Sequence, residues 1–221
     1  MSHFDQELCA AGAQLSALGL SPGTSGNISV RVGSEIHLSP SGTSLGQLDP
    51  AGLSILSMET DPAQHIAGPR PSKEFGLHEA FYRRDPGAVC VIHLHSTHAA
   101  AVSCLPAWAP HSALPPLTPY LLMRLGNLPL LPYHPPGSPE QAVELREIAF
   151  DCRGVLLQNH GPVVAGATVE EAIARAVEVE EAARTVLAVA HRADVVLLDD
   201  DQAEHLASRY GQPWGAEPVN R

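Results

Sequence analysis

Two histidines separated by one residue form the first candidate site in this sequence. The run 89–98 begins with β-branched and apolar residues, which are typical of a strand in a buried sheet. Side chains alternate between faces along a strand, so His93 and His95 should point one way, and Ile92 and Leu94 the other. Their imidazoles, roughly 6–7 Å apart at the backbone, could converge on one metal ion or hydrogen-bond to each other.

Two further residues could complete a metal site with this pair. His160 lies at the tip of a predicted strand that starts at Gly154, and Glu74 lies at the start of a predicted helix. Three imidazoles and a carboxylate are a credible donor set for zinc. Nitrogen donors favour zinc over magnesium, although manganese, cobalt and iron accept the same donors. A carboxylate beside a catalytic metal can also move protons once substrate binds.

Two polar, glycine-bearing loops, 21–27 and 39–43, precede these residues. They offer hydroxyls and free backbone N–H groups, and their glycines let the backbone approach a ligand. Each loop alone is typical of an ordinary turn, whereas two of them in an acidic protein indicate an anion pocket. A third anion-binding element is the predicted helix start, where Ser72 is expected to be the N-cap and Lys73 follows it.

Glu74 and His78 lie four residues apart and therefore share a face of this predicted helix. His78 is expected to be a core histidine, or one that supports the metal ligands, and not a ligand itself. No spacing elsewhere matches the phosphate-binding loops of nucleotide enzymes.

The elements that must position these residues are mixed strands and helices. Helices are expected at 4–18 and 169–191, with shorter ones starting at Ser72, Ala99 and Ser138, the last with a capping-box Gln141. The surface glutamates of 169–191 are expected to face solvent. Strands are expected at 28–32, 35–38, 53–58, 128–132 and from Gly154, while 61–71 has the composition of a loop. This order predicts one α/β domain over 1–221, with a mainly antiparallel central sheet flanked by helices.

Composition excludes several classes of protein. The chain has 221 residues with 44% hydrophobic content, enough for one large core, and a net charge of −11, which leaves no basic surface for nucleic acid. No apolar run is long enough to cross a bilayer, and the N-terminus lacks the pattern of a signal peptide. The four cysteines are scattered without paired spacing, which suits a reducing compartment. We therefore expect a cytoplasmic protein with no nucleic-acid or membrane partner.

As a set, Glu74, the run 93–98 and Asn159-His160-Gly161 resemble the class II aldolase and adducin family, over roughly residues 5–210. The resemblance implies an αβα sandwich and a homotetramer with active sites at subunit interfaces. It implies a zinc site of Glu74, His93, His95 and His160. For a small phosphorylated sugar substrate, it implies a phosphate pocket of Asn27, Ser41, Gly42, Ser72 and Lys73. The family's aldolases commonly have a second serine at the position of Lys73, and a lysine would also bind an anion.

The resemblance also implies catalytic roles. Glu74 and Tyr120 are the candidate proton donors, with Tyr120 corresponding to a tyrosine that the neighbouring subunit supplies. Tyr210 is a weaker match to a C-terminal active-site tyrosine.

Within the family, four stretches most resemble the members that decarboxylate 3-oxo-tetronate 4-phosphate: 71–74, 93–98, 115–120 and 158–166. This implies zinc-dependent loss of carbon dioxide through a metal-stabilised enediolate, giving dihydroxyacetone phosphate. Retro-aldol cleavage of a ketose phosphate leaves the same kind of enediolate, so the site residues alone leave an aldolase or epimerase open. A non-catalytic adducin-like interaction module is the third alternative, and the complete set of metal-site residues argues against it.

Overall fold

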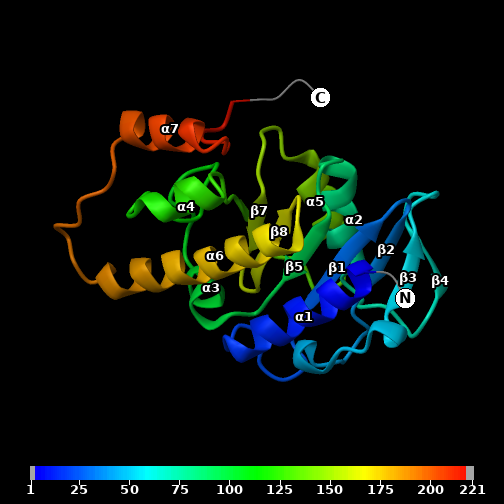
Figure 1. The fold of residues 1–221 in the computed structure, drawn as a ribbon. Coiled ribbons are helices and arrows are strands. Elements are labelled where there is room, and N and C mark those ends of the chain that lie inside the picture. The colour runs from blue at the N-terminus through cyan, green and yellow to red at the C-terminus, as the bar shows by residue number, and fades with distance from the viewer. Residues whose placement is uncertain (1–2, 218–221) are drawn as a thin grey trace.

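The computed structural model describes residues 3–217 as an eight-stranded sheet with helices on both faces (Figure 1). The strand order is β4-β3-β2-β1-β5-β8-β7-β6, and every pair is antiparallel except β6 with β7. The strands are β1 (Asn27–Val32), β2 (Glu35–Leu38), β3 (Ser54–Ser57), β4 (Gln64–Ala67), β5 (Cys90–His93), β6 (Leu130–Leu131), β7 (Gly154–Leu157) and β8 (Gly161–Gly166). The helices are α1 (His3–Ala17), α2 (Phe75–Arg84), α3 (Thr97–Val102), α4 (Pro119–Arg124), α5 (Pro139–Glu147), α6 (Val169–Val189) and α7 (Asp200–Arg209).

Alternation along β5 divides the core into two layers. Cys90 and Ile92 pack in the cluster that includes side chains of α1, α3, α4 and α6, whereas Val91 packs in the cluster of α2 and α5. All three side chains are at most 1% exposed. His93 follows Val91 by two residues, so it emerges on the α2 face of the sheet. The predicted α/β sheet covered by helices is confirmed, and the expected edge strand at 128–132 is present as β6.

The segment 61–71, expected to be a loop, contains strand β4 at the edge of the sheet. All four residues of β4 are exposed, so the strand has no alternating apolar pattern by which the sequence could reveal it. Backbone pairing with β3 alone defines this strand.

Two predicted helix caps differ from the structure. Helix α2 begins at Phe75 with Glu74 in the N-cap position. Ser72 lies two residues before this cap, and its Oγ accepts a hydrogen bond from the Glu74 N–H at 3.3 Å. Ser138 hydrogen-bonds to the Glu140 carboxylate, and Gln141 donates to the His134 carbonyl, so α5 has no capping box. In both cases the polar side chain hydrogen-bonds to a nearby group other than the one that the predicted cap requires.

Helix α6 begins as the sequence predicts. Thr168 Oγ1 accepts a hydrogen bond from the Glu171 N–H at 3.1 Å. The last part of the chain contains α7 and Tyr210, and residues 218–221 lie outside the described part. Within residues 3–217, no helix has the length and apolarity that crossing a bilayer requires.

Candidate metal centre

The antiparallel pairing of β5 with β8 brings the histidines together. His93 lies opposite Val163, so the turn between β7 and β8, which carries His160, adjoins the end of β5. Asn159 bends this turn with a positive φ of 55°. A Cβ at Gly161 would lie 2.2 Å from the Leu94 carbonyl oxygen, so only glycine fits there.

The three imidazoles point their Nε2 atoms at one another. The His93–His95 and His95–His160 Nε2 distances are both 3.0 Å, and the His93–His160 distance is 3.3 Å. Glu74 completes the group, with Oε2 at 3.5 Å from His93 Nε2 and Oε1 at 3.3 Å from His160 Nε2. The structure therefore brings together all four residues that the sequence predicts as metal ligands.

Burial keeps these imidazoles neutral. Desolvation holds the pKa of His93 well below its usual value, and the neighbouring His160 and His95 lower it further. Desolvation also lowers the pKa values of His95 and His160, although the Glu74 carboxylate opposes both shifts. Neutral imidazole is the form that binds a metal ion.

The hydrogen bonds of the donors fit a cation. The Nδ1–H of His93 donates to the Pro162 carbonyl oxygen at 2.9 Å, so a neutral His93 carries its lone pair on Nε2. Glu74 Oε1 is buried and accepts no hydrogen bond within the described chain. In a tetrahedral site with bonds of about 2.0–2.1 Å, neighbouring donor atoms lie roughly 3.3–3.4 Å apart. The observed spacings of 3.0–3.5 Å are close to this value, so the donor set fits a zinc-sized ion.

The residues predicted to bind phosphate surround Glu74 on adjoining segments. Asn27 lies opposite His93 in the sheet, and its Nδ2 donates to Glu74 Oε2 at 2.9 Å. The 39–43 loop is held beside the start of α2, because the Ser41 N–H donates to the Arg70 carbonyl oxygen at 3.0 Å. Ser41 and Gly42 are exposed, whereas Asn27 and Ser72 are 4% and 7% exposed.

Lys73 is exposed and supplies a positive charge beside the metal centre. Its ammonium is one of the causes that lower the pKa of His160, after burial and His95 and against the opposing effect of Glu74. An ammonium at this position can attract a phosphate or carboxylate group to the mouth of the site.

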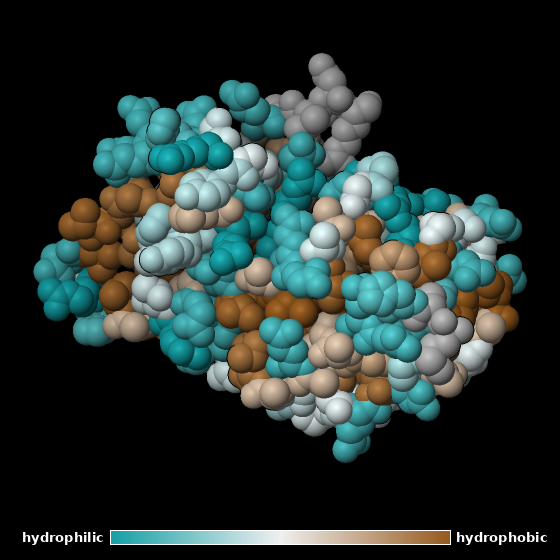
Figure 2. Space-filling view, viewed as in Figure 1, coloured by the Kyte–Doolittle hydropathy of each residue, from teal (hydrophilic) through white to brown (hydrophobic). Residues whose placement is uncertain are grey.

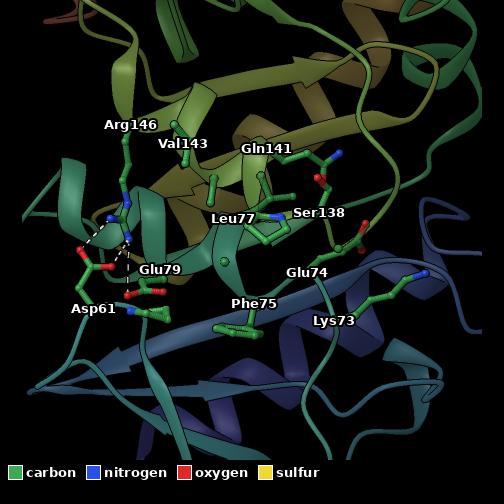
Figure 3. A pocket seen from close by; sticks show the side chains of 15 residues that line it. Asp61, Lys73, Glu74, Phe75, Leu77, Glu79, Ser138, Gln141, Val143 and Arg146 are labelled. Atoms are coloured by element: carbon green, nitrogen blue, oxygen red, sulfur yellow. Dashed lines mark hydrogen bonds and ion pairs between the residues drawn. The ribbon is translucent and has the colours of Figure 1, made fainter.

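Two hollows adjoin these residues. Lys73 and Glu74 lie at one end of a mostly apolar cavity of about 340 Å³ between α2 and α5, and Asp61, Glu79 and Arg146 form an ion-paired group at its other end (Figure 3). Ser41 instead borders a separate hollow of about 460 Å³. The predicted phosphate residues thus lie on adjoining segments, with Lys73 and Ser41 bordering two different hollows.

The two candidate tyrosines stand apart from the histidines. Tyr120 is the second residue of α4 and is 59% exposed, and no hydrogen bond joins it to the cluster within residues 3–217. Tyr210 borders a hollow with Asp85 and Arg153. Arg153 precedes β7 and Asp85 precedes β5, so Tyr210 lies at the opposite end of these strands from His93 and His160.

The sequence interpretation missed Glu180, and the expectation that the glutamates of α6 face solvent is wrong at this position. Glu180 is 4% exposed, and its carboxylate accepts the backbone N–H groups of His98 and Ala99 at 3.0 and 2.9 Å. It thereby caps α3 directly after the ligand-bearing segment. The spacing of α6 offered a signal, because Glu180 follows Ile173 by seven residues and precedes Ala183 by three, which places it on the buried face of the helix.

The sequence interpretation also missed Ser29 and Tyr82, which lie behind Glu74. The expectation that His78 is a buried histidine is confirmed, because it is 0% exposed, and it hydrogen-bonds to both Asn27 and Ser29. A signal was available: Asn27 and Ser29 share one strand face, and Glu74, His78 and Tyr82 recur every four residues.

Comparison with known proteins agrees with this geometry. Residues 6–187 match the model of the class II aldolase and adducin N-terminal domain. A 3-oxo-tetronate 4-phosphate decarboxylase from Cupriavidus necator is 40% identical over 83% of both chains, and an L-fuculose phosphate aldolase from Escherichia coli is 30% identical over 86% of this chain and 85% of that one. The crystal structure of YgbL from Klebsiella pneumoniae superposes with a TM-score of 0.85 at 35% identity, covering 92% of this chain and 97% of the other. The chain belongs to the class II aldolase and adducin family.

Proposed function

We propose that this protein is a zinc-dependent decarboxylase that converts 3-oxo-tetronate 4-phosphate into dihydroxyacetone phosphate and carbon dioxide. The observation that carries the proposal is the convergence of His93, His95, His160 and Glu74 on one point. Decarboxylases of this name from several bacteria, 37–41% identical over most of the chain, support the choice of substrate.

The reaction breaks the C1–C2 bond of the acid and leaves the bonding electron pair on C2. A bound divalent ion would act as a Lewis acid that stabilises the negative charge developing on the substrate's oxygen atoms. His93, His95 and His160 would hold the ion, and their neutral state at physiological pH suits that task. Zinc suits this donor set best, and manganese, cobalt or iron would also accept it.

A proton must then reach C2 to complete the product. Glu74 is the candidate within this chain to take up a proton and pass it to C2, because its buried Oε1 accepts no hydrogen bond from the described residues. Tyr120 is the second candidate. Its exposure of 59%, away from the cluster of its own chain, suits a role in the site of a neighbouring subunit.

The substrate phosphate is proposed to lie among Asn27, Ser41, Gly42, Ser72 and Lys73. These residues combine backbone N–H groups, hydroxyls and one ammonium, the groups that bind phosphate in proteins. The carboxylate of the substrate should lie away from the metal. It can leave there as a neutral molecule, and low local polarity favours that departure.

The proposal extends to assembly and location. We propose a homotetramer in the cytoplasm, with active sites at the subunit interfaces. Figure 2 shows apolar side chains gathered over the connection between α6 and α7, where Val196 is 87% exposed, and association would remove this surface from water. Light scattering after size-exclusion chromatography would measure the mass, and a 23 kDa particle would contradict the tetramer.

One comparison of substrates tests the reaction. The purified enzyme is incubated separately with 3-oxo-4-phosphotetronate, fuculose 1-phosphate and ribulose 5-phosphate, and carbon dioxide, aldehyde and xylulose phosphate are measured. We expect rapid release of carbon dioxide from the keto acid and no reaction with the others. An aldehyde from fuculose phosphate, or epimerisation of ribulose phosphate, without carbon dioxide would replace the proposal by an aldolase or an epimerase. Inertness towards all three together with no bound metal would favour the non-catalytic module.

A further inference from the structure

A chain of buried hydrogen bonds runs from Glu74 into the sheet beneath α2. Asn27 Nδ2 donates to Glu74 Oε2 at 2.9 Å, and Asn27 Oδ1 is hydrogen-bonded to His78 Nε2. On the other side of the ring, His78 Nδ1 lies 2.7 Å from Ser29 Oγ, and Ser29 Oγ lies 2.7 Å from the Tyr82 hydroxyl. None of these five side chains is more than 7% exposed.

The carboxylate at one end sets the direction of every bond. A carboxylate accepts only, so Asn27 must turn its NH₂ group to Glu74 and its carbonyl oxygen to His78. That oxygen needs a donor, so the proton of neutral His78 is on Nε2 and the lone pair is on Nδ1. Ser29 must then donate to Nδ1 and accept from Tyr82. Burial keeps this ring neutral, because it lowers the pKa of His78 to about 3.

This arrangement makes the two oxygens of Glu74 different. Oε2 accepts a hydrogen bond from the Asn27 amide and lies 3.5 Å from His93 Nε2, whereas Oε1 has no donor among the described residues and lies 3.3 Å from His160 Nε2. If the Asn27 amide turned over, its carbonyl oxygen would face the carboxylate, and the repulsion would move Glu74 away from its present orientation. His78 opposes this rotation, because its Nε2–H has no other acceptor among its described contacts.

We propose that His78 is a positioning residue of the active site: its Nε2–H fixes the orientation of the Asn27 amide, which holds Glu74 Oε2 and leaves Oε1 directed at the histidine cluster. The inference rests on the proposed function only for the effect on turnover. The tautomer of His78 and the orientation of Asn27 are properties of the chain itself.

The first test is the tautomer of His78 in the purified wild-type protein. Solution NMR of protein labelled with ¹⁵N-histidine distinguishes a protonated ring nitrogen from one that carries a lone pair. We expect His78 to be neutral, with the proton on Nε2, across the pH range in which the protein is folded and active. A proton on Nδ1 would reverse the hydrogen-bond chain and overturn the proposal.

The second test uses variants of His78. His78→Phe keeps the ring shape and removes the donor, and we expect a loss in kcat of about 10- to 100-fold with KM within about threefold. His78→Gln restores one donor and one acceptor in the same sense, so it should recover most of that loss. The visible absorption of cobalt-loaded protein, which reports the ligand geometry, should change in His78→Phe and return towards wild type in His78→Gln.

Glu79→Gln is the matched control. Glu79 is the next residue of α2 and is 1% exposed, but its carboxylate contacts the Ala63 N–H, Arg83 and Arg146 at the other end of the cavity from Glu74 (Figure 3). This variant should lose stability without changing the cobalt spectrum or the ratio of kcat to KM.

The outcomes separate this proposal from the proposed function. Wild-type kcat and an unchanged cobalt spectrum in His78→Phe would overturn the positioning role, as would equal losses in His78→Phe and Glu79→Gln. If wild-type protein released no carbon dioxide from the keto acid, the tautomer and the cobalt spectra would still decide the role of His78. If His78→Phe failed to fold, the wild-type tautomer and the spectrum of His78→Gln would decide it.

Discussion

The short segment 93–98 contributes histidines to two clusters that each contain a glutamate. The two glutamates differ in how their carboxylate oxygens are hydrogen-bonded. Glu74 faces the ring nitrogens of His93 and His160, and its Oε1 atom has no hydrogen-bond donor in the described chain. Glu180 accepts two backbone N–H groups at the start of α3 and contacts His98 Nδ1 at 2.7 Å. A carboxylate beside histidines is therefore a candidate metal ligand only where its lone pairs lack donors.

The electrostatics follow the same division. Burial alone would raise the pKa of Glu180, but the N–H groups of His98 and Ala99 and the His98 side chain lower it overall. A carboxylate that is fully satisfied in this way stabilises the fold and has no free lone pair for an ion. Glu74 keeps its buried Oε1 atom without a donor among the described residues, and an unsatisfied buried carboxylate oxygen beside histidines is typical of a functional site.

Removal of a ligand should have the largest effect on the first cluster. His95→Ala and His160→Ala should each abolish tight metal binding and lower kcat/KM by at least about 10³-fold, because the loss of Lewis-acid stabilisation is worth several kcal/mol. Both side chains lie at strand ends, so the fold should persist. Metal content per chain and circular dichroism measure the two effects, and full metal occupancy in either variant would remove that histidine from the site.

A change at Glu74 separates proton transfer from binding. Glu74→Gln keeps the size of the side chain and removes its basicity, so kcat should fall by about 10²- to 10⁴-fold while KM changes little. Steady-state kinetics together with metal analysis provide the measurement. If metal content and substrate affinity fell in parallel with kcat, Glu74 would be chiefly a ligand.

A change in the second cluster should affect stability and leave the metal in place. Glu180→Gln should lower the free energy of unfolding by about 1–2 kcal/mol at pH 7 through weakened charge-assisted hydrogen bonds. The pKa of Glu180 is lower in the folded state, so this contribution is complete above the unfolded pKa of 4.5 and is lost as pH falls through the folded value. Urea unfolding at several pH values tests this, with exposed Glu181→Gln as the control. Loss of metal in Glu180→Gln would show that the two clusters are coupled.

The smallest effect concerns Glu178, two residues from Glu180 on the same helix. Burial raises the pKa of Glu178 to about 6, and Glu181 adds to the shift while Arg124 opposes it. The folded state therefore favours the protonated form, and stability falls as pH rises from 4.5 through 6. Glu178→Gln should raise the free energy of unfolding by about 1 kcal/mol at pH 7, after discounting for solvent screening, and by nothing near pH 4.5. An equal gain at both pH values would contradict this explanation.

Local pattern determined much of this protein. Alternation along β5 predicted the face on which His93 emerges, and His95, which follows the end of the strand, still brings its Nε2 to 3.0 Å from that of His93. Helix α6 begins at Val169, where the sequence predicts it. The triplet Asn159-His160-Gly161 resembled the family strongly enough to predict His160 in the site. Such features depend on strand or turn geometry over a few residues, which the sequence encodes directly.

The tertiary structure alone decided the rest. Strand β4 forms through backbone hydrogen bonds to β3. The N-cap of α2 is Glu74 and not Ser72. Glu180 is buried because α3 packs its unpaired N–H groups against α6. The series of hydrogen bonds from Tyr82 to Glu74 forms because one face of α2 packs over Asn27 and Ser29 of β1. Each of these outcomes is a choice of hydrogen-bond partner between residues distant in sequence, and that choice is made only when the sheet and its helices have come together.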